Sequence, residues 1–261
     1  MKRLERTFTS LKENGRKAIV PYIMGGDGGL ECLSDRLIKL EKWGATAIEV
    51  GVPFSDPVAD GPTIQKAGIR ALENGTTLKA IIHELEKARD TITIPLILMT
   101  YMNPIYSYGI DQFTVDIQNA GVDGCIIPDL PLEEEEIVAP QLTKAGIELI
   151  RLVTPTTTLE RIKTISSRGK GFLYAVTVKG ITGTRSNYDQ SLNEFLQTVK
   201  EVSSIPVLAG FGISKGAQMK ELAALCDGVI IGSKVVELFE KNDLKELETL
   251  ISVFRQESKI M

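Results

Sequence analysis

The chain has 261 residues, of which 43% are hydrophobic and 25% are charged, and its formal net charge is −4. These values lie within the globular range and exclude a disordered or collagen-like chain. The charges are mixed and form no basic stripe, and no apolar run reaches the roughly eighteen residues of a membrane span, so we expect neither nucleic acid nor membrane as a partner. The first residues lack the apolar segment of a signal peptide, and we therefore expect a cytoplasmic protein.

Eight short β-rich segments recur along the chain, separated by segments with helical periodicity. They lie at residues 18–23, 47–50, 94–99, 124–127, 148–153, 171–176, 206–209 and 228–231. Near-continuous apolar runs of this kind are typical of strands buried on both faces of a parallel sheet. Among the helices expected between them, one ends at Gly44, which can adopt the left-handed conformation. The last begins after Asp243, with Glu246 completing a capping box.

Eight alternating strand and helix units match a (β/α)8 barrel better than an open doubly wound sheet. An open sheet of that type usually has five or six strands and a glycine fingerprint after the first. No linker of the kind that joins domains interrupts the pattern. The predicted fold is therefore α/β, a single-domain (β/α)8 TIM barrel with extra helices that covers residues 1–261.

Two carboxylates fall where such a barrel has its active site, at the C-terminal ends of the strands and in the loops that follow. Glu49 ends the second strand, and Asp60 lies in the next loop, which contains three prolines and two glycines. Two acids in different environments can take different protonation roles, as acid/base catalysis requires. The alternative is an exposed strand end and a solvated turn aspartate.

Glycine clusters follow the last three strands, at residues 180–183, 210–214 and 232–233. Glycine lets backbone N–H groups approach an anion closely, and a helix N-terminus adds a favourable partial charge. Each glycine alone could be an ordinary turn residue, but their joint placement predicts a phosphate site. The long polar segment 177–188 beside them favours a mobile lid over a packed turn.

Nothing in the sequence indicates a metal site or a disulfide framework. His83 is the only histidine, and three cysteines, Cys32, Cys125 and Cys226, lie far apart without metal-ligand spacing. The acidic run at residues 133–136 is expected at a helix N-terminus, where negative charge is favourable, rather than at a metal.

In the order and spacing of these motifs the chain resembles the α subunits of tryptophan synthase. The matching segments are EVGVPFSDPVADGPTIQ at 49–65, PDLP at 128–131, GITG at 180–183, GFGIS at 210–214 and GS at 232–233. The resemblance implies a lyase of tryptophan biosynthesis that cleaves indole-3-glycerol phosphate, by a retro-aldol reaction, to indole and glyceraldehyde 3-phosphate. It also implies a β subunit as partner in an α2β2 heterotetramer. Pyridoxal phosphate is then expected only in that β subunit, with no cofactor in this chain.

The resemblance also assigns site residues. Glu49 matches the acid/base carboxylate of the family and Asp60 its second catalytic acid. A retro-aldol reaction needs one proton delivered to indole C3 and another removed from the neighbouring hydroxyl, which Glu49 could transfer while Asp60 accepts the indole N–H. The implied substrate-binding residues are Tyr22, Met99, Tyr101 and Phe211 around the indole, Tyr174 and Thr182 near the glycerol phosphate and the lid, and Gly183, Gly212, Gly232 and Ser233 at the phosphate.

Three other functions stay open at this point. The chain could be another phosphosugar barrel enzyme such as an epimerase or isomerase, although it lacks the histidine and metal ligands that those barrels usually employ. It could be a catalytically silent partner that only activates a β subunit, although both carboxylates are present. It could also be a lyase that acts alone and releases free indole. The proline-stiffened loop 53–57 is the candidate docking surface for a partner, or else only a rigid turn.

Overall fold

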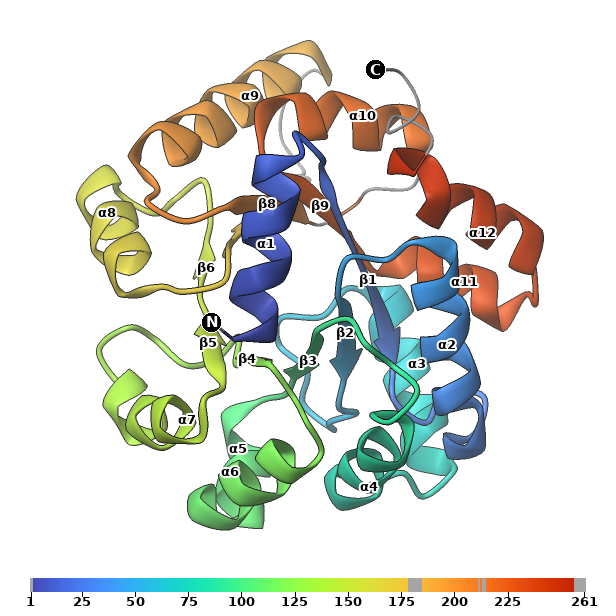
Figure 1. Cartoon of the computed structure of the whole chain (residues 1–261). Helices are drawn as coiled ribbons and strands as arrows, with labels where there is room; N and C mark the ends of the chain where they lie inside the picture. The colour runs from blue at the N-terminus through green and yellow to red at the C-terminus, as the bar shows by residue number, and fades with distance from the viewer. Residues whose placement is uncertain (1, 178–184, 211, 213–214, 256–261) are drawn as a thin grey trace.

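The computed structural model describes residues 2–177, 185–210, 212 and 215–255, with the backbone alone described at 185–189. A parallel β-sheet curls into a barrel that helices surround (Figure 1). Its described strands are β1 (Ala18–Met24), β2 (Ile48–Gly51), β3 (Leu96–Met99), β4 (Gly124–Ile126), β5 (Glu148–Ile150), β6 (Leu152–Val153), β7 (Leu173–Val176), β8 (Val207–Gly210) and β9 (Gly228–Ile231). They follow the order β5-β4-β3-β2-β1-β9-β8-β7-β6, which confirms the predicted barrel.

The fifth predicted strand, 148–153, is divided at Arg151 into β5 and β6. β5 pairs with β4, β6 pairs with β7, and the Tyr174 amide donates to the Arg151 carbonyl at 3.0 Å. The Arg151 guanidinium turns to the Glu135 carboxylate, with Nε 2.8 Å from Oε2, and to the carbonyl of Arg168 at 3.0 Å. The chain itself therefore joins the two edges of the sheet, and we call this junction the Arg151 seam.

Helices alternate with the strands as predicted. The described helices are α1 (Arg3–Glu13), η1 (Leu30–Cys32), α2 (Leu33–Trp43), α3 (Pro62–Glu73), α4 (Leu78–Ala88), α5 (Met102–Tyr108), α6 (Ile110–Asn119), η2 (Glu135–Ile137), α7 (Ala139–Ala145), α8 (Leu159–Arg168), α9 (Arg185–Val202), α10 (Gly216–Leu225), α11 (Ser233–Glu240), α12 (Leu244–Ile251) and η3 (Ser252–Phe254). Gly44 ends α2 with φ +108°, and the Asp243 carboxylate accepts the Glu246 amide at 3.1 Å. The predicted end at Gly44 and the N-cap at Asp243 are confirmed. The reciprocal half of the capping box is not formed, because the Asp243 amide donates to the Leu238 carbonyl at 2.9 Å and the Glu246 carboxylate pairs with Lys234 at 3.0 Å.

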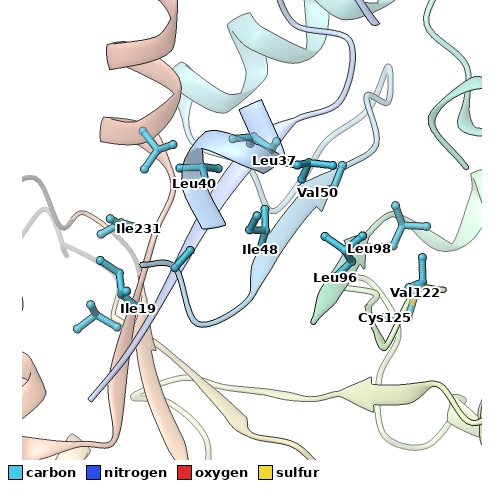
Figure 2. Packing of buried hydrophobic residues seen from close by; sticks show 14 of the residues in the cluster. Ile19, Leu37, Leu40, Ile48, Val50, Leu96, Leu98, Val122, Cys125 and Ile231 are labelled. Atoms are coloured by element: carbon cyan, nitrogen blue, oxygen red, sulfur yellow. The ribbon is translucent and has the colours of Figure 1, made fainter. Parts of the chain in front are cut away.

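Side chains alternate between the two faces of each strand. Ile48 and Val50 of β2 point outward and pack beneath Leu37 and Leu40 of α2 (Figure 2), and all four are fully buried. Burial of apolar surface between sheet and helices, worth roughly 25 cal/mol per Å², is the main force that fixes these positions. Glu49, which lies between the two outward residues, therefore points into the barrel.

The N-terminal end of the barrel is filled by α1, which lies across the ends of the strands (Figure 1). Leu4 and Phe8 of α1 are buried among interior residues such as Val20 and Ile97, and the Phe8 ring lies 5.3 Å from that of Phe172. This contact closes the barrel at one end and leaves the C-terminal end for a ligand.

The acidic run at 133–136 differs from the expectation at one residue. It does precede α7, but Glu135 is only 5% exposed and forms ion pairs with Arg151 at 2.8 Å and with Arg168 at 3.0 Å. A buried carboxylate must be paired because an isolated charge is costly to desolvate. Glu135 thus stabilises the Arg151 seam rather than a helix terminus.

Glu135→Ala is expected to lower the free energy of unfolding by about 3 kcal/mol, because it leaves the Arg151 guanidinium without its carboxylate. Urea unfolding measures this change. Glu133→Ala is the matched control, since the Glu133–Arg161 pair has side chains 60% and 41% exposed and its loss should hardly move the midpoint. Equal destabilisation of the two variants would contradict the structural role of Glu135.

Candidate active site

Glu49 is the most buried carboxylate of the site. β2 places it in register with Tyr22 on β1 and Ile97 on β3. The residue is 1% exposed, and its Oε2 has no hydrogen-bond partner among the described atoms. Burial, and after it the charge of Asp60, raises the pKa of Glu49 to about 8. Glu49 therefore carries a proton at neutral pH.

Asp60 reaches the same place from the loop between β2 and α3. Pro62 occupies the first position of α3, where its fixed φ suits a helix start, and the Gln65 amide side chain donates to the Asp60 carbonyl at 2.9 Å. Burial raises the pKa of Asp60 to about 6, and hydrogen bonding from Tyr101 counteracts part of that rise. Asp60 is therefore mostly ionised at neutral pH, where Glu49 is mostly protonated.

A cavity at the C-terminal end of the barrel joins the two carboxylates to the glycines predicted to hold phosphate. Its described lining consists of Tyr22, Glu49, Asp60, Gly61, Ile64, Met99, Tyr174, Gly212, Ile230, Gly232 and Ser233. The structure thus brings together most of the predicted site residues. Tyr101 lies beside Asp60 rather than in this lining. Thr182, Gly183 and Phe211 lie outside the described residues.

Tyr22 and Tyr174 are positioned by the same packing arrangement. Each lies over a glycine of the neighbouring strand: a Cβ atom at Gly51 would be 1.9 Å from the Tyr22 hydroxyl, and one at Gly210 would be 2.4 Å from the Tyr174 ring. Glycine at these two positions therefore makes room for the rings. Burial, with the charges of Asp60 and Glu49, raises the pKa of both tyrosines, so both stay neutral.

Gly212, Gly232 and Ser233 form another end of the same cavity. Gly212 has φ +68°, a conformation that glycine adopts at least cost. Gly232 and Ser233 begin α11, whose first N–H groups have no partner within the helix. The side chain of Lys234, the next residue along α11, is engaged in an ion pair with Glu246 at 3.0 Å. This end therefore offers backbone N–H groups and a helix N-terminus to an anion.

A second cavity, of about 690 Å³, adjoins the first at Met99 and Tyr174. It extends past the loop after β4 to the Arg151 seam. The Asp129 carboxylate in that loop accepts the Met102 amide at 3.0 Å and so fixes the loop against the start of α5. Together the two cavities provide room for an aromatic ring system beside the carboxylates.

Sequence reasoning missed Ile64 and Ile230, which add apolar surface to the cavity. A signal was present for each. Ile64 lies on the buried stripe of α3 with Ala67 and Ala71. Ile230 follows Gly228 by two residues in its strand, so strand alternation places Gly228 and Ile230 on the same face of the sheet.

The part of the chain that the structure describes shows neither a metal-binding cluster nor a membrane-spanning helix. Within it, no group of three or more His, Cys, Asp or Glu residues could hold a metal ion. Nor is any helix within it long and apolar enough to span a bilayer.

Comparisons with known proteins agree on one family. The family model described as "Tryptophan synthase alpha chain" matches residues 8–260. A curated tryptophan synthase alpha chain from Bacillus cereus is 51% identical over 244 residues, covering 94% of this chain and 95% of the relative. The crystal structure of the Legionella pneumophila tryptophan synthase alpha chain superposes with a TM-score of 0.88 at 35% identity, covering 98% of this chain and 97% of that one. A ligand-free tryptophan synthase variant from M. tuberculosis gives 0.87 at 33% identity, covering 97% and 98%.

Proposed function

This chain belongs to the tryptophan synthase alpha chain family, and on that premise we propose how its site residues divide the work. The reaction is the retro-aldol cleavage of indole-3-glycerol phosphate to indole and glyceraldehyde 3-phosphate. One observation carries the division of roles: Glu49 and Asp60 line one cavity, and burial raises the pKa of Glu49, the more buried of the two, further than that of Asp60. Family membership decides against an epimerase, an isomerase or a catalytically silent partner.

Glu49 acts first as an acid and then as a base. It donates its proton to C3 of the indole ring, which leaves a positive charge on the ring nitrogen. The resulting carboxylate takes the proton of the hydroxyl on the adjacent carbon, the C–C bond breaks, and that oxygen becomes the aldehyde. The bonding electrons return to the ring and restore indole. The Oε2 atom supports this role, because no hydrogen bond from the described residues holds that oxygen.

Asp60 accepts the indole N–H and stabilises the positive charge that develops there. A carboxylate in a cavity shielded from water stabilises such a positive charge more strongly than a carboxylate in bulk solvent does. The indole ring lies against Tyr22, Met99 and Tyr101, and Tyr174 lies toward the glycerol phosphate. Phe211, which the resemblance also assigns to the ring, lies outside the described residues. Because the tyrosine rings are buried and neutral, they supply apolar surface without adding charge.

The phosphate binds to backbone N–H groups at Gly212, Gly232 and Ser233. Thr182 and Gly183, which the resemblance also assigns to the substrate, lie outside the described residues. The N-terminus of α11 supports this placement of the phosphate. Anchored there, the substrate reaches across the cavity to Glu49 and Asp60, and this fixed orientation favours the reaction.

Gly212→Leu is expected to raise KM for indole-3-glycerol phosphate roughly tenfold more than Gly212→Ala. Both variants place a Cβ atom on a residue with φ +68° and share that backbone strain, but only leucine adds a side chain long enough to obstruct the proposed anion site. Steady-state kinetics, with thermal melting to check that the two variants are equally folded, makes the comparison. A leucine variant with the KM of the alanine variant would place the phosphate elsewhere.

The partner is the β subunit of tryptophan synthase, in an α2β2 complex. Pyridoxal phosphate belongs to that subunit. This chain forms one domain over residues 1–261 and needs no cofactor, because the indole ring itself accepts the electrons.

Loop 53–57 is the docking surface, which the exposure of Ser55 and Asp56 supports. The complex works in the cytoplasm.

Incubation of the purified chain with indole-3-glycerol phosphate tests the function. Indole and glyceraldehyde 3-phosphate should appear in equal amounts, and faster when a β subunit is added. If neither product forms in the presence of that subunit, the assignment fails.

A further inference from the structure

Tyr101 contacts the loop that carries Asp60 at two points. Its hydroxyl accepts the Ala59 amide at 3.0 Å, and its ring lies 5.3 Å from the Phe54 ring with 32° between their planes. Tyr101 is itself 3% exposed and directly precedes α5. A rigid, buried side chain of the next strand-helix unit therefore holds both ends of this loop.

The loop needs such support because its own contacts are short-range. The Val58 amide donates to the backbone carbonyl of Asp56 at 2.9 Å, and the Asp60 amide donates to that of Pro57 at 3.1 Å. Val58 is 83% exposed. Bonds between near neighbours fix a turn but do not fix its position over the barrel, whereas the Tyr101 contacts join the loop to β3.

We propose that Tyr101 is a positioning residue, which holds Asp60 at the cavity by anchoring Ala59 and Phe54 and by donating its hydroxyl proton to the Asp60 carboxylate. The inference rests on the role proposed above for Asp60. The hydroxyl can do both, since it accepts one hydrogen bond from Ala59 and has a proton left to donate. Its donation lowers the pKa of Asp60, and burial with the charge of Asp60 raises the pKa of Tyr101.

The other titratable groups around this pair, among the described residues, do not perform the same task. Glu49 on β2, Tyr22 on β1 and Tyr174 on β7 share the cavity with Asp60, and Asp129 acts on Tyr101 from the loop after β4. Tyr22 has its described hydrogen bond to Met24 instead, at 3.8 Å. Tyr101 is thus the described donor that favours the ionised form of Asp60.

Carbon NMR of the Asp60 carboxyl in the substrate-free chain tests the proposal without depending on activity. The signal is assigned by its loss in Asp60→Asn. In Tyr101→Phe, which keeps the ring and removes the hydroxyl, the titration midpoint of Asp60 should rise by about one pH unit. Tyr106→Phe is the matched control: it removes an exposed phenolic hydroxyl from α5, the helix that follows Tyr101, and should leave the midpoint in place. An unshifted midpoint in Tyr101→Phe overturns the inference.

Activity gives the second measurement. Tyr101→Phe should lose most of its kcat at pH 6 and progressively less as the pH rises toward 7.5, because Asp60 then becomes ionised. A kcat reduced by the same factor at both pH values would show a merely structural role and count against the proposal. If wild-type protein cleaves no substrate while the Asp60 midpoint still shifts, the proposed function fails and the positioning role stands.

Discussion

Glu49→Gln is expected to lower kcat for indole-3-glycerol phosphate cleavage by roughly a thousandfold, the scale of a lost general acid and base. KM should change little, because glutamine keeps the shape of the side chain and the phosphate end is untouched. The neutral amide can neither donate the proton to C3 nor take the hydroxyl proton. Steady-state kinetics on the purified chain, alone and with a β subunit, measures both constants.

Glu148→Gln provides the matched control for this substitution. Glu148 is another buried glutamate of the barrel, 9% exposed, but it pairs with Lys2 at 2.6 Å at the far end. Its replacement should leave kcat unchanged. A Glu49→Gln enzyme with near-normal turnover would show that another group carries the protons.

The same variant should also be more stable than wild type at pH 8. The pKa of Glu49 in the folded state, about 8, lies above that of an unfolded glutamate. The folded chain therefore loses stability as the pH rises from the unfolded-state pKa to the folded-state pKa. Glutamine has no charge to desolvate and removes the penalty. A loss of activity with a gain in melting temperature would mark Glu49 as a residue kept for function.

Asp60→Asn is expected to lower kcat roughly a hundredfold and to change the shape of the pH profile. Wild-type kcat/KM should be bell-shaped, falling below pH 6 as Asp60 gains a proton and above pH 8 as Glu49 loses its own. Asparagine cannot titrate, so the acidic limb should disappear. The alkaline limb should move to lower pH, because the Asp60 charge that raises the pKa of Glu49 is gone.

Profiles of kcat/KM from about pH 5 to 9 measure both limbs, with the pH range set by the two groups. Asp56→Asn is the control, since it removes an exposed carboxylate from the same loop and should keep both limbs in the isolated chain. An acidic limb that persists in Asp60→Asn would assign it to another group.

The alternation of strands and helices was predictable from the sequence because buried strands have a strong local signature. The segment 228–231 coincides with β9, and the convergence of Glu49 and Asp60 followed from barrel topology. The division of the fifth strand was not predictable. At that point Arg151 pairs with Glu135, sixteen residues away, and no local periodicity reports such a contact.

Which of these side chains meet in one cavity was easier to predict than their electrostatics. The sequence indicated two acids with different roles, but which one holds a proton depends on burial that only the folded chain defines. Tyr101 illustrates the limit: resemblance placed it at the indole, whereas its bond to Ala59 depends on the path of a loop held by few local contacts. The roles of individual site residues remain predictions for the experiments above.

Tyr22 and Tyr174 line the active-site cavity, and each lies over a glycine of the neighbouring strand, so the room left for a ligand depends on those glycines. Gly51 and Gly210 control that room from behind the rings, since any larger residue there would push a ring inward and narrow the gap. To admit a larger bicyclic ligand, a redesign would therefore replace Tyr22 or Tyr174 with a smaller residue and keep both glycines. Two residues without a side chain, Gly51 and Gly210, therefore limit the size of the ligand that fits between the rings.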